Sequence, residues 1–406
     1  MEVFGAIGAV IKDRWRASGF DEEAFADIAT DVLAREIPRG GVALDDVVTW
    51  VHGCRTLPTQ IDHPFGQPIT VFHDPRFYID VLTWVDGTTS IHEHGFSGAF
   101  GVLVGSSLHA SYAFHRTRRY CEHLFAGRTE LTGRELLKVG DVRPIHAGPR
   151  SAHALFHLER PSVSVVVRNP RTTTAPIQLT YLRSGIAYNP FHVDIECQRL
   201  VRTLEIMHEL EHPLLLARAR ALIDDRDPFT AWKLAELLAR KLKHDDYVAF
   251  LAAAPFRHAE LFAAIAANAA DTRRELNLVS RRRAIRSEPH RFLVALLLNL
   301  HDPADILRLV KARVPRADPI DTVMRWVVEL AGEPPTEPGE PNAIGIALDE
   351  LALTTMRSLL GGAGDEQVLE ALAAEYDGVD DVRAALLELC AAFRRSIFFA
   401  PLFPPR

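Results

Sequence analysis

Cysteines, long apolar runs and excess positive charge are scarce in this sequence of 406 residues. Its four cysteines, Cys54, Cys121, Cys197 and Cys390, are far apart and form no C-x-x-C pair, so we expect free thiols rather than disulfides. No apolar run of about eighteen residues and no leader pattern is present, which favours a cytoplasmic protein without a membrane span. The net charge of −7 argues against nucleic acid as a partner, because phosphate binding needs clustered Lys and Arg. The expected partners are small molecules or proteins.

The composition changes twice along the chain. Residues 1–56 and 190–406 have apolar residues at helical spacing, whereas residues 57–189 consist of short runs rich in Val, Ile, Phe, Tyr and Thr between turn residues. We therefore predict an α+β protein in three parts: an N-terminal helical segment, an antiparallel β-barrel, and a large all-α domain. The expected strands are 69–73, 77–85, 88–94, 98–104, 107–114, 119–124, 142–145, 152–158, 162–168 and 177–182.

Aspartates mark several expected helix starts. An Asp before the first turn accepts hydrogen bonds from backbone amides, and a following Pro suits the first helical position. These signals predict helices over 21–37, 228–242, 302–313 and 319–331, beginning at Asp21, Asp227-Pro228, Asp302-Pro303 and Asp318-Pro319. A longer helix is expected over 194–223.

Two histidines stand one residue apart in Ile91-His92-Glu93-His94, at the end of an apolar, β-branched run. Strand side chains alternate between faces, so His92 and His94 point to one side, about 7 Å apart along the chain, and Glu93 points away. A third ligand is expected from residues 140–157, where His153 and His157 share one face of a strand and His146 lies in the preceding loop. His92 and His94 by themselves would supply two ligands of a metal site. His109 and His115 carry no spacing signal and are interpreted as packing or surface residues.

Over about residues 65–185, the glycines and histidines resemble the two motif blocks of the cupin superfamily: Gly87-x4-His92-x-His94-x10-Gly105 and Gly140-x7-Gly148-x4-His153-x3-His157. Within that superfamily the chain is most similar to the cysteine dioxygenase-like thiol dioxygenases, which share the Ser-Ile-His-x-His sequence and a later Ser-x-His. The resemblance implies that His92, His94 and His153 bind iron(II), with a small thiol or amino-acid-like substrate and O2 beside it. The spacing alone leaves Zn, Mn, Ni and Cu open.

The sequence also departs from that family. Gly98 and Ala99 stand where many cupins have a glutamate ligand, and they offer no cysteine for a Cys–Tyr crosslink. The nearest candidate for the family's carboxylate-binding arginine, Arg76, does not align. His157 is interpreted as a hydrogen-bonded partner that orients a ligand or substrate, with the alternative that it replaces His153 as the third ligand.

Other pocket residues follow from the resemblance and from the aromatic content of the strands. Tyr181, in the late position where thiol dioxygenases place a catalytic tyrosine, and His157 are the catalytic candidates. Trp84, Phe100, Tyr112 and His146 are expected to line the substrate pocket, although aromatic residues in a barrel also serve as core.

A metal-dependent oxygenase acting on a small molecule is the leading functional prediction. One alternative is a cupin with a structural metal that binds a protein partner or a second copy through its helical domain, where Arg281-Arg282-Arg283 forms a basic cluster. Another is a metal-dependent lyase, isomerase or hydrolase in which the metal acts as a Lewis acid.

Overall fold

The computed structural model describes residues 2–37, 43–54, 56–61, 67–85, 89–253, 257, 259–336, 339–375 and 382–403. Gly87 of the first motif block lies outside these residues. The chain divides into two compact units, Met1–Asp271 and Thr272–Arg406. The first unit holds the predicted helical segment, the predicted β-structure and several of the helices that follow it.

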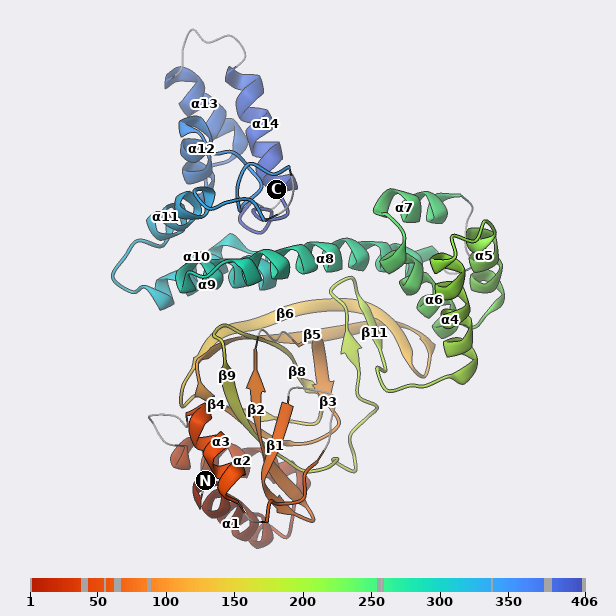
Figure 1. Cartoon of the computed structure of the whole chain (residues 1–406), viewed down its shortest axis with the longest axis vertical. Coiled ribbons are helices and arrows are strands. Elements are labelled where there is room, and N and C mark those ends of the chain that lie inside the picture. The colour runs from red at the N-terminus through yellow and green to blue at the C-terminus, as the bar shows by residue number, and fades with distance from the viewer. Residues whose placement is uncertain are drawn as a thin grey trace. The chain divides into compact units, whose positions relative to one another are not determined.

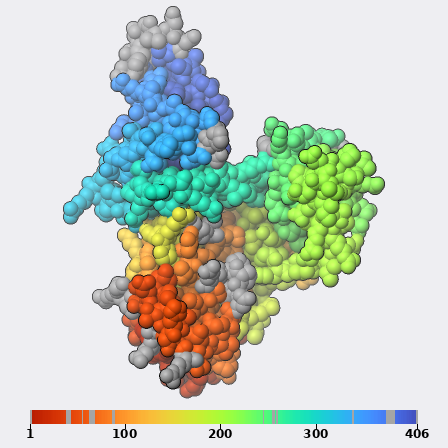
Figure 2. Space-filling model, viewed as in Figure 1, coloured from red at the N-terminus to blue at the C-terminus, as the bar shows by residue number. Residues whose placement is uncertain are grey.

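A five-stranded antiparallel sheet and three N-terminal helices, which are red to orange-red in Figures 1 and 2, form one part of the first unit. The strand order is β1-β2-β9-β4-β7. The helices are α1 (Glu2–Ala17), α2 (Glu22–Glu36) and α3 (Leu44–Gly53). The strands are β1 (Gln67–Asp74), β2 (Phe77–Trp84), β4 (Gly98–Val104), β7 (Val142–Ile145) and β9 (Ser162–Arg168). Asp21 caps α2 as predicted, accepting a hydrogen bond from the Glu23 amide.

Side chains along the central strands point alternately to the two sides of this sheet, so its two faces differ. One face, which includes Ile79, Val81 and Val165, packs against apolar side chains of α1 and α2. The intervening residues of β2 and β9 point to the other side, where they line a cavity together with residues of the remaining strands. Because the side-chain period of a strand is two, a single run of sequence supplies both the core and the cavity wall.

The other six strands are joined in a ring of antiparallel pairs, in the order β10-β11-β6-β5-β8-β3, with β3 pairing back to β10. They are β3 (Ile91–His94), β5 (Ser106–Cys121), β6 (Leu124–Lys138), β8 (Gly148–His157), β10 (Thr180–Tyr181) and β11 (Ile186–Tyr188). All six strands contribute residues to one apolar cluster. The predicted antiparallel β-structure is confirmed, as a sheet and a ring of strands rather than one barrel.

The long hairpin of β5 and β6 exceeds the predicted strands 107–114 and 119–124. Residues 125–138 were not expected to form a strand, because glycines and charged residues interrupt their apolar pattern. Most of this strand is only partly buried, so its side chains carry little of the hydrophobic signal that a sequence pattern detects. Its backbone is satisfied by pairing with β5 along nearly its full length.

Helices complete the first unit. They are α4 (Ile195–Glu209), α5 (Leu215–Asp225), α6 (Pro228–Lys241), α7 (His244–Ala252) and α8 (Ala259–Ala284), the last of which continues past the boundary between the units. The single helix predicted over 194–223 is wrong, because the chain turns at Glu211, which has a positive φ of 49°, and at Pro213, which has no amide hydrogen. Asp227 caps α6 as predicted.

The second unit contains helices in the part of the chain that the structure describes. They are α9 (Glu288–Asn299), α10 (Pro303–Arg313), α11 (Pro319–Ala331), α12 (Glu350–Leu360), α13 (Asp365–Glu375) and α14 (Val382–Arg395). Asp302 and Asp318 cap α10 and α11 as predicted. Arg281 is buried and hydrogen-bonded to the Ala343 carbonyl at 2.9 Å, so it is a structural residue rather than part of a solvated basic face. None of the described helices combines the length and apolarity needed to cross a bilayer.

Candidate metal centre

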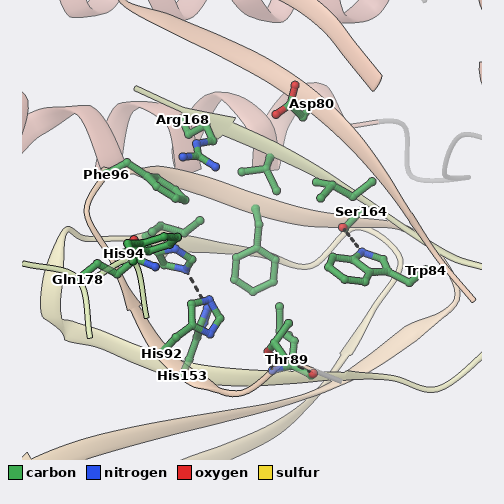
Figure 3. Close-up of a pocket in the computed structure, with 16 residues that line it drawn as sticks. Asp80, Trp84, Thr89, His92, His94, Phe96, His153, Ser164, Arg168 and Gln178 are labelled. Carbon is green, nitrogen blue, oxygen red and sulfur yellow. Dashed lines mark hydrogen bonds between the residues drawn. The ribbon is translucent and has the colours of Figure 1, made fainter. Parts of the chain in front are cut away.

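Three histidines from two neighbouring strands bring their ring nitrogens together. His92 and His94 extend from β3, and His153 extends from β8, where it pairs directly with His92. One nitrogen from each ring lies within 4.8 Å of the others, and the two Nε2 atoms of His94 and His153 are 3.0 Å apart (Figure 3). The register of β3 against β8 therefore brings the three histidines predicted from the sequence together.

The separation of two of these nitrogens, those of His94 and His153, suits ligands of one metal ion. Two imidazole nitrogens that each lie about 2.1 Å from one ion, at a right angle, are about 3.0 Å apart, whereas a tetrahedral angle would separate them by about 3.4 Å. The 3.0 Å between His94 and His153 matches the right angle. The Nδ1 atom of His92 donates to the Ser90 carbonyl at 2.8 Å, which leaves its Nε2 lone pair for a ligand. The residues fit a three-histidine metal site.

The protonation of the trio also suits metal binding. Burial, followed by the neighbouring histidines, holds the pKa values of His94 and His153 well below the usual 6.5. Burial lowers the pKa of His92 as well, against the opposing effect of its hydrogen bond to Ser90. The rings are therefore neutral near pH 7, and a neutral imidazole is the form that binds a metal.

A cavity of about 260 Å³ lies between the five-stranded sheet and the strands that carry the histidines (Figure 3). Its walls are mainly apolar. The lining side chains are Asp80, Leu82, Trp84, Thr89, His92, His94, Phe96, Phe100, Ile145, His153, Leu155, Ser164, Val166, Arg168, Gln178 and Phe191. The site thus offers a metal-binding corner in a small, largely apolar chamber.

Arg168, at the end of β9, is a cation in this cavity that the sequence pattern missed. Its guanidinium lies 3.6 Å from the ring centre of Phe96 and 5.4 Å from that of Tyr78. Its Nε is buried without a hydrogen-bond partner among the described residues, and burial lowers its pKa. Arg76, the candidate from the sequence, instead stacks on Phe20, 3.6 Å from its ring centre. Side chains along β9 alternate between the two faces of the sheet, and this period of two could have placed Arg168 on the cavity face from the sequence.

The structure explains why no carboxylate ligand occupies the position four or five residues after His94. A Cβ added to Gly98 would lie 1.9 Å from the Val167 carbonyl oxygen, so any side chain there collides with the neighbouring strand. Ala99 faces the opposite way, into the core beneath the N-terminal helices. Neither position can present a fourth ligand to the histidines.

Two of the four predicted pocket residues line the cavity. Trp84 and Phe100 do so, and the Trp84 indole donates to the Ser164 hydroxyl at 3.0 Å. Tyr112 belongs instead to the apolar cluster inside the ring of six strands. His146 does not line the cavity, although its neighbour Ile145 does. Strand parity explains Tyr112, which lies on the opposite face of β5 from the cavity, whereas His146 follows the end of β7.

Tyr181, the first catalytic candidate, does not reach the histidines. It packs in the cluster inside the ring, and its hydroxyl donates to the Glu93 carboxylate. Glu93 points away from its two histidine neighbours as predicted, but that side is buried, with the Leu179 amide donating to the second carboxylate oxygen at 3.1 Å. Burial raises the pKa of Glu93. The sequence expectation of a tyrosine at the metal centre is therefore wrong for Tyr181.

His157 lies four residues beyond His153 on β8, roughly 13 Å along the strand. It is absent from the nitrogen cluster and stacks on Trp84 at a centroid distance of 4.4 Å. Its Nδ1 contacts the Ser107 hydroxyl at 3.0 Å, while its Nε2 is buried and has no hydrogen-bond partner in the part of the chain that the structure describes. Burial lowers the pKa of His157 to about 3. Of the two alternatives for the third nitrogen, the geometry favours His153, and His157 supports a wall of the cavity through Trp84.

Neither a family model nor a curated protein matches the sequence. Among solved structures, the chain is similar to an uncharacterized conserved protein with a double-stranded β-helix domain from Klebsiella pneumoniae subsp. pneumoniae MGH 78578. The identity is 16%, with 34% of this chain and 93% of that chain covered and a TM-score of 0.19. A second similar chain comes from the crystal structures of the DMSP lyases RdDddP and RnDddQII, with 14% identity, coverage of 41% and 93%, and a TM-score of 0.22. With TM-scores this low, neither likeness bears on the function, which we infer from the geometry of the site.

Proposed function

We propose that the chain is a cupin-type, metal-dependent oxygenase that acts on a small molecule. The observation that carries the proposal is the three-histidine group at one wall of a small cavity, where neither Gly98 nor Ala99 can present a carboxylate ligand. Three neutral ligands leave the net charge of a divalent ion uncompensated, which favours an anionic substrate in the remaining positions.

His92, His94 and His153 would hold the metal, and iron(II) is the ion that the family resemblance favours. A bound iron(II) ion would supply the redox chemistry that couples O2 to oxidation of the substrate. The chain itself contributes an apolar lining beside the histidines, which includes Phe96, Phe100 and Leu155.

The narrower proposal is a small thiol that bears a carboxylate. Arg168 supports it, because its half-buried guanidinium has a buried Nε with no hydrogen-bond partner among the described residues and is suited to pair with a carboxylate. The size of the cavity, about 260 Å³, restricts the substrate to a molecule smaller than most drug-like ligands.

The test begins with the full-length protein purified without added metal, whose metal content is then measured. The iron(II)-loaded protein is next supplied with mercaptoacetate, cysteine and cysteamine, and O2 consumption is recorded. We expect uptake with the two thiol acids and little with cysteamine, which has no carboxylate. Arg168→Met should raise KM for the acids with little effect on bound iron, because Arg168 contacts the substrate and not the metal.

His92→Ala and His153→Ala should each lose bound metal and O2 uptake. His115→Ala is the matched control, since His115 is an exposed histidine on β5 and pairs with Glu130. Full metal content in both ligand variants would refute the metal site. Equal O2 uptake with the thiol acids and with cysteamine would refute the role of Arg168 in binding a carboxylate. Full turnover of the substrate under strict anaerobiosis would refute the oxygenase proposal and favour a reaction in which the metal acts as a Lewis acid.

A further inference from the structure

We propose that His109, itself held by Glu135, is a positioning residue that fixes the tautomer and orientation of His153. The inference rests on the proposed metal site and extends it, since His109 would make no contact with metal or substrate. A hydrogen-bonded chain runs from the buried histidine ligand through His109 and Glu135 to Arg143 near the surface.

Each link of this chain is short. His153 Nδ1 lies 3.0 Å from His109 Nε2, and His109 Nδ1 lies 2.9 Å from a carboxylate oxygen of Glu135. The same carboxylate accepts from Arg143, whose Nε is 2.9 Å from Oε1 and whose second nitrogen bonds Oε2. The register of the ring supports these contacts, because β5 pairs His109 directly with Glu135 of β6 and pairs Ser111 with His153 of β8.

The direction of the hydrogen bonds follows from the carboxylate. An ionised carboxylate only accepts, so the hydrogen between Glu135 and His109 resides on His109 Nδ1. In a neutral ring the other nitrogen, Nε2, is then an acceptor, and it must receive its hydrogen from His153 Nδ1. His153 is thereby left with its lone pair on Nε2, the atom that faces His94.

The surroundings keep this arrangement in place. The two histidines are almost completely buried, with 7% of His109 and 5% of His153 exposed. Phe100 packs edge-on against both rings, with centroid distances of 5.6 Å and 5.9 Å. Arg143, followed by His109, lowers the pKa of Glu135 to about 2, so the carboxylate is ionised at neutral pH.

The test measures metal affinity and tautomer in the full-length protein. Metal-free protein is titrated with Co(II), and binding is followed by visible absorption in competition with a chelator. Removing an outer partner of a ligand typically weakens metal binding about 10–100-fold, so we expect a loss of this size for His109→Phe. Glu135→Ala should give a smaller loss in the same direction, and Glu135→Gln, which retains an acceptor oxygen, should recover most of it.

Glu130→Ala is the matched control. Glu130 forms the same kind of pair with His115, at 3.0 Å, on the same two strands, but both side chains are exposed. This variant should bind Co(II) with unchanged affinity. A role in folding alone would not move histidine tautomers, so ¹⁵N spectra of histidine-labelled, Zn(II)-loaded protein provide the second readout. They should show His109 protonated at Nδ1 and His153 protonated at Nδ1 in the wild type.

The possible results separate the inference from the proposed site. Metal binding that is lost in His153→Ala but unchanged in both His109→Phe and Glu135→Ala would overturn the positioning role and leave the metal site standing. Metal binding that persists in His153→Ala would instead overturn the site itself. A His109 ring protonated at Nε2 in the labelled wild type would also overturn the inference. If His109→Phe does not fold, the comparison of Glu135→Ala with Glu135→Gln still decides it.

Discussion

Gly98→Ala is the substitution for which this structure predicts the sharpest effect. Gly98 begins β4, directly opposite Arg168 of β9 in the five-stranded sheet. Its backbone is not in the positive-φ region, so the consequence comes from space rather than from conformational strain. The added Cβ would lie 1.9 Å from the Val167 carbonyl oxygen and 3.0 Å from the Arg168 Cα.

The distance that the Val167 carbonyl must move determines how much stability is lost. Cβ atoms essentially never approach a neighbour closer than 3.0 Å, so the carbonyl must retreat from 1.9 Å to 3.0 Å, a displacement of 1.1 Å. Two adjacent hydrogen bonds, from the Asn169 amide to the Ser97 carbonyl (3.1 Å) and from the Ser97 amide to the Asn169 side chain (2.9 Å), would exceed hydrogen-bonding distance. Their loss costs about 1–3 kcal/mol, overpacking adds about 1–3 kcal/mol, and the entropic gain of Gly→Ala returns about 0.5–1 kcal/mol. We expect a net destabilisation of about 1–5 kcal/mol.

Hydrogen–deuterium exchange of peptides from β4 and β9, together with urea unfolding, measures this effect locally and globally. Exchange should increase at both strand ends, and the proposed binding of a substrate carboxylate by Arg168 should weaken because the Arg168 backbone is displaced. Gly133→Ala is the matched control, since Gly133 also lies within a strand and its added Cβ would meet nothing closer than 3.8 Å. A Gly98→Ala protein with unchanged exchange and stability would refute the steric reasoning.

Two further predictions concern Glu135 and Tyr181. Because Arg143 is the main cause of the lowered pKa of Glu135, about 2 against the usual 4.5, the ionised side chain stabilises the fold above pH 4.5, and this contribution is lost as the pH falls toward 2. In urea unfolding, Glu135→Gln should therefore be less stable than wild type by about 1 kcal/mol at pH 7, after allowance for solvent screening. This difference in the free energy of unfolding should shrink below pH 4.5. A difference that does not change with pH would contradict the prediction. Tyr181→Phe removes a donor from buried Glu93 and should cost about 1–2 kcal/mol in the same assay, while Co(II) affinity stays within about threefold of wild type because the hydroxyl lies on the far side of β3. A large loss of metal affinity in Tyr181→Phe would show that the tyrosine does serve the metal centre.

Strand β3 links two buried polar groups that face opposite ways. On one side His92 and His94 meet His153, and on the other Glu93 is bonded by Tyr181 and the Leu179 amide. The hydrogen bonds of Glu93 connect β3 to the segment around β10, which also pairs with β3 through the backbone. The histidines are therefore held on a strand anchored from behind, which is how a rigid metal site is supported.

Local signals in the sequence were sufficient for many features. Aspartate caps predicted where α2, α6, α10 and α11 begin, because a cap needs only the residue and the next turn of chain. Strand periodicity placed His92 and His94 on one face, for the same local reason. The strand β6 was missed because its polar, partly exposed side chains contain no apolar alternation.

The sequence by itself thus determined the antiparallel β-structure, the capped helices and the shared face of the histidine pair, since these depend on neighbours within a few residues. Tertiary structure alone decided what faces that pair. The register of β3 against β8 selected His153 over His157, and the β5–β6 hairpin brought His109 and Glu135 behind it. It also assembled the cavity that Arg168 lines and left Tyr181 outside it, because contacts between strands far apart in the sequence leave no mark in a local pattern.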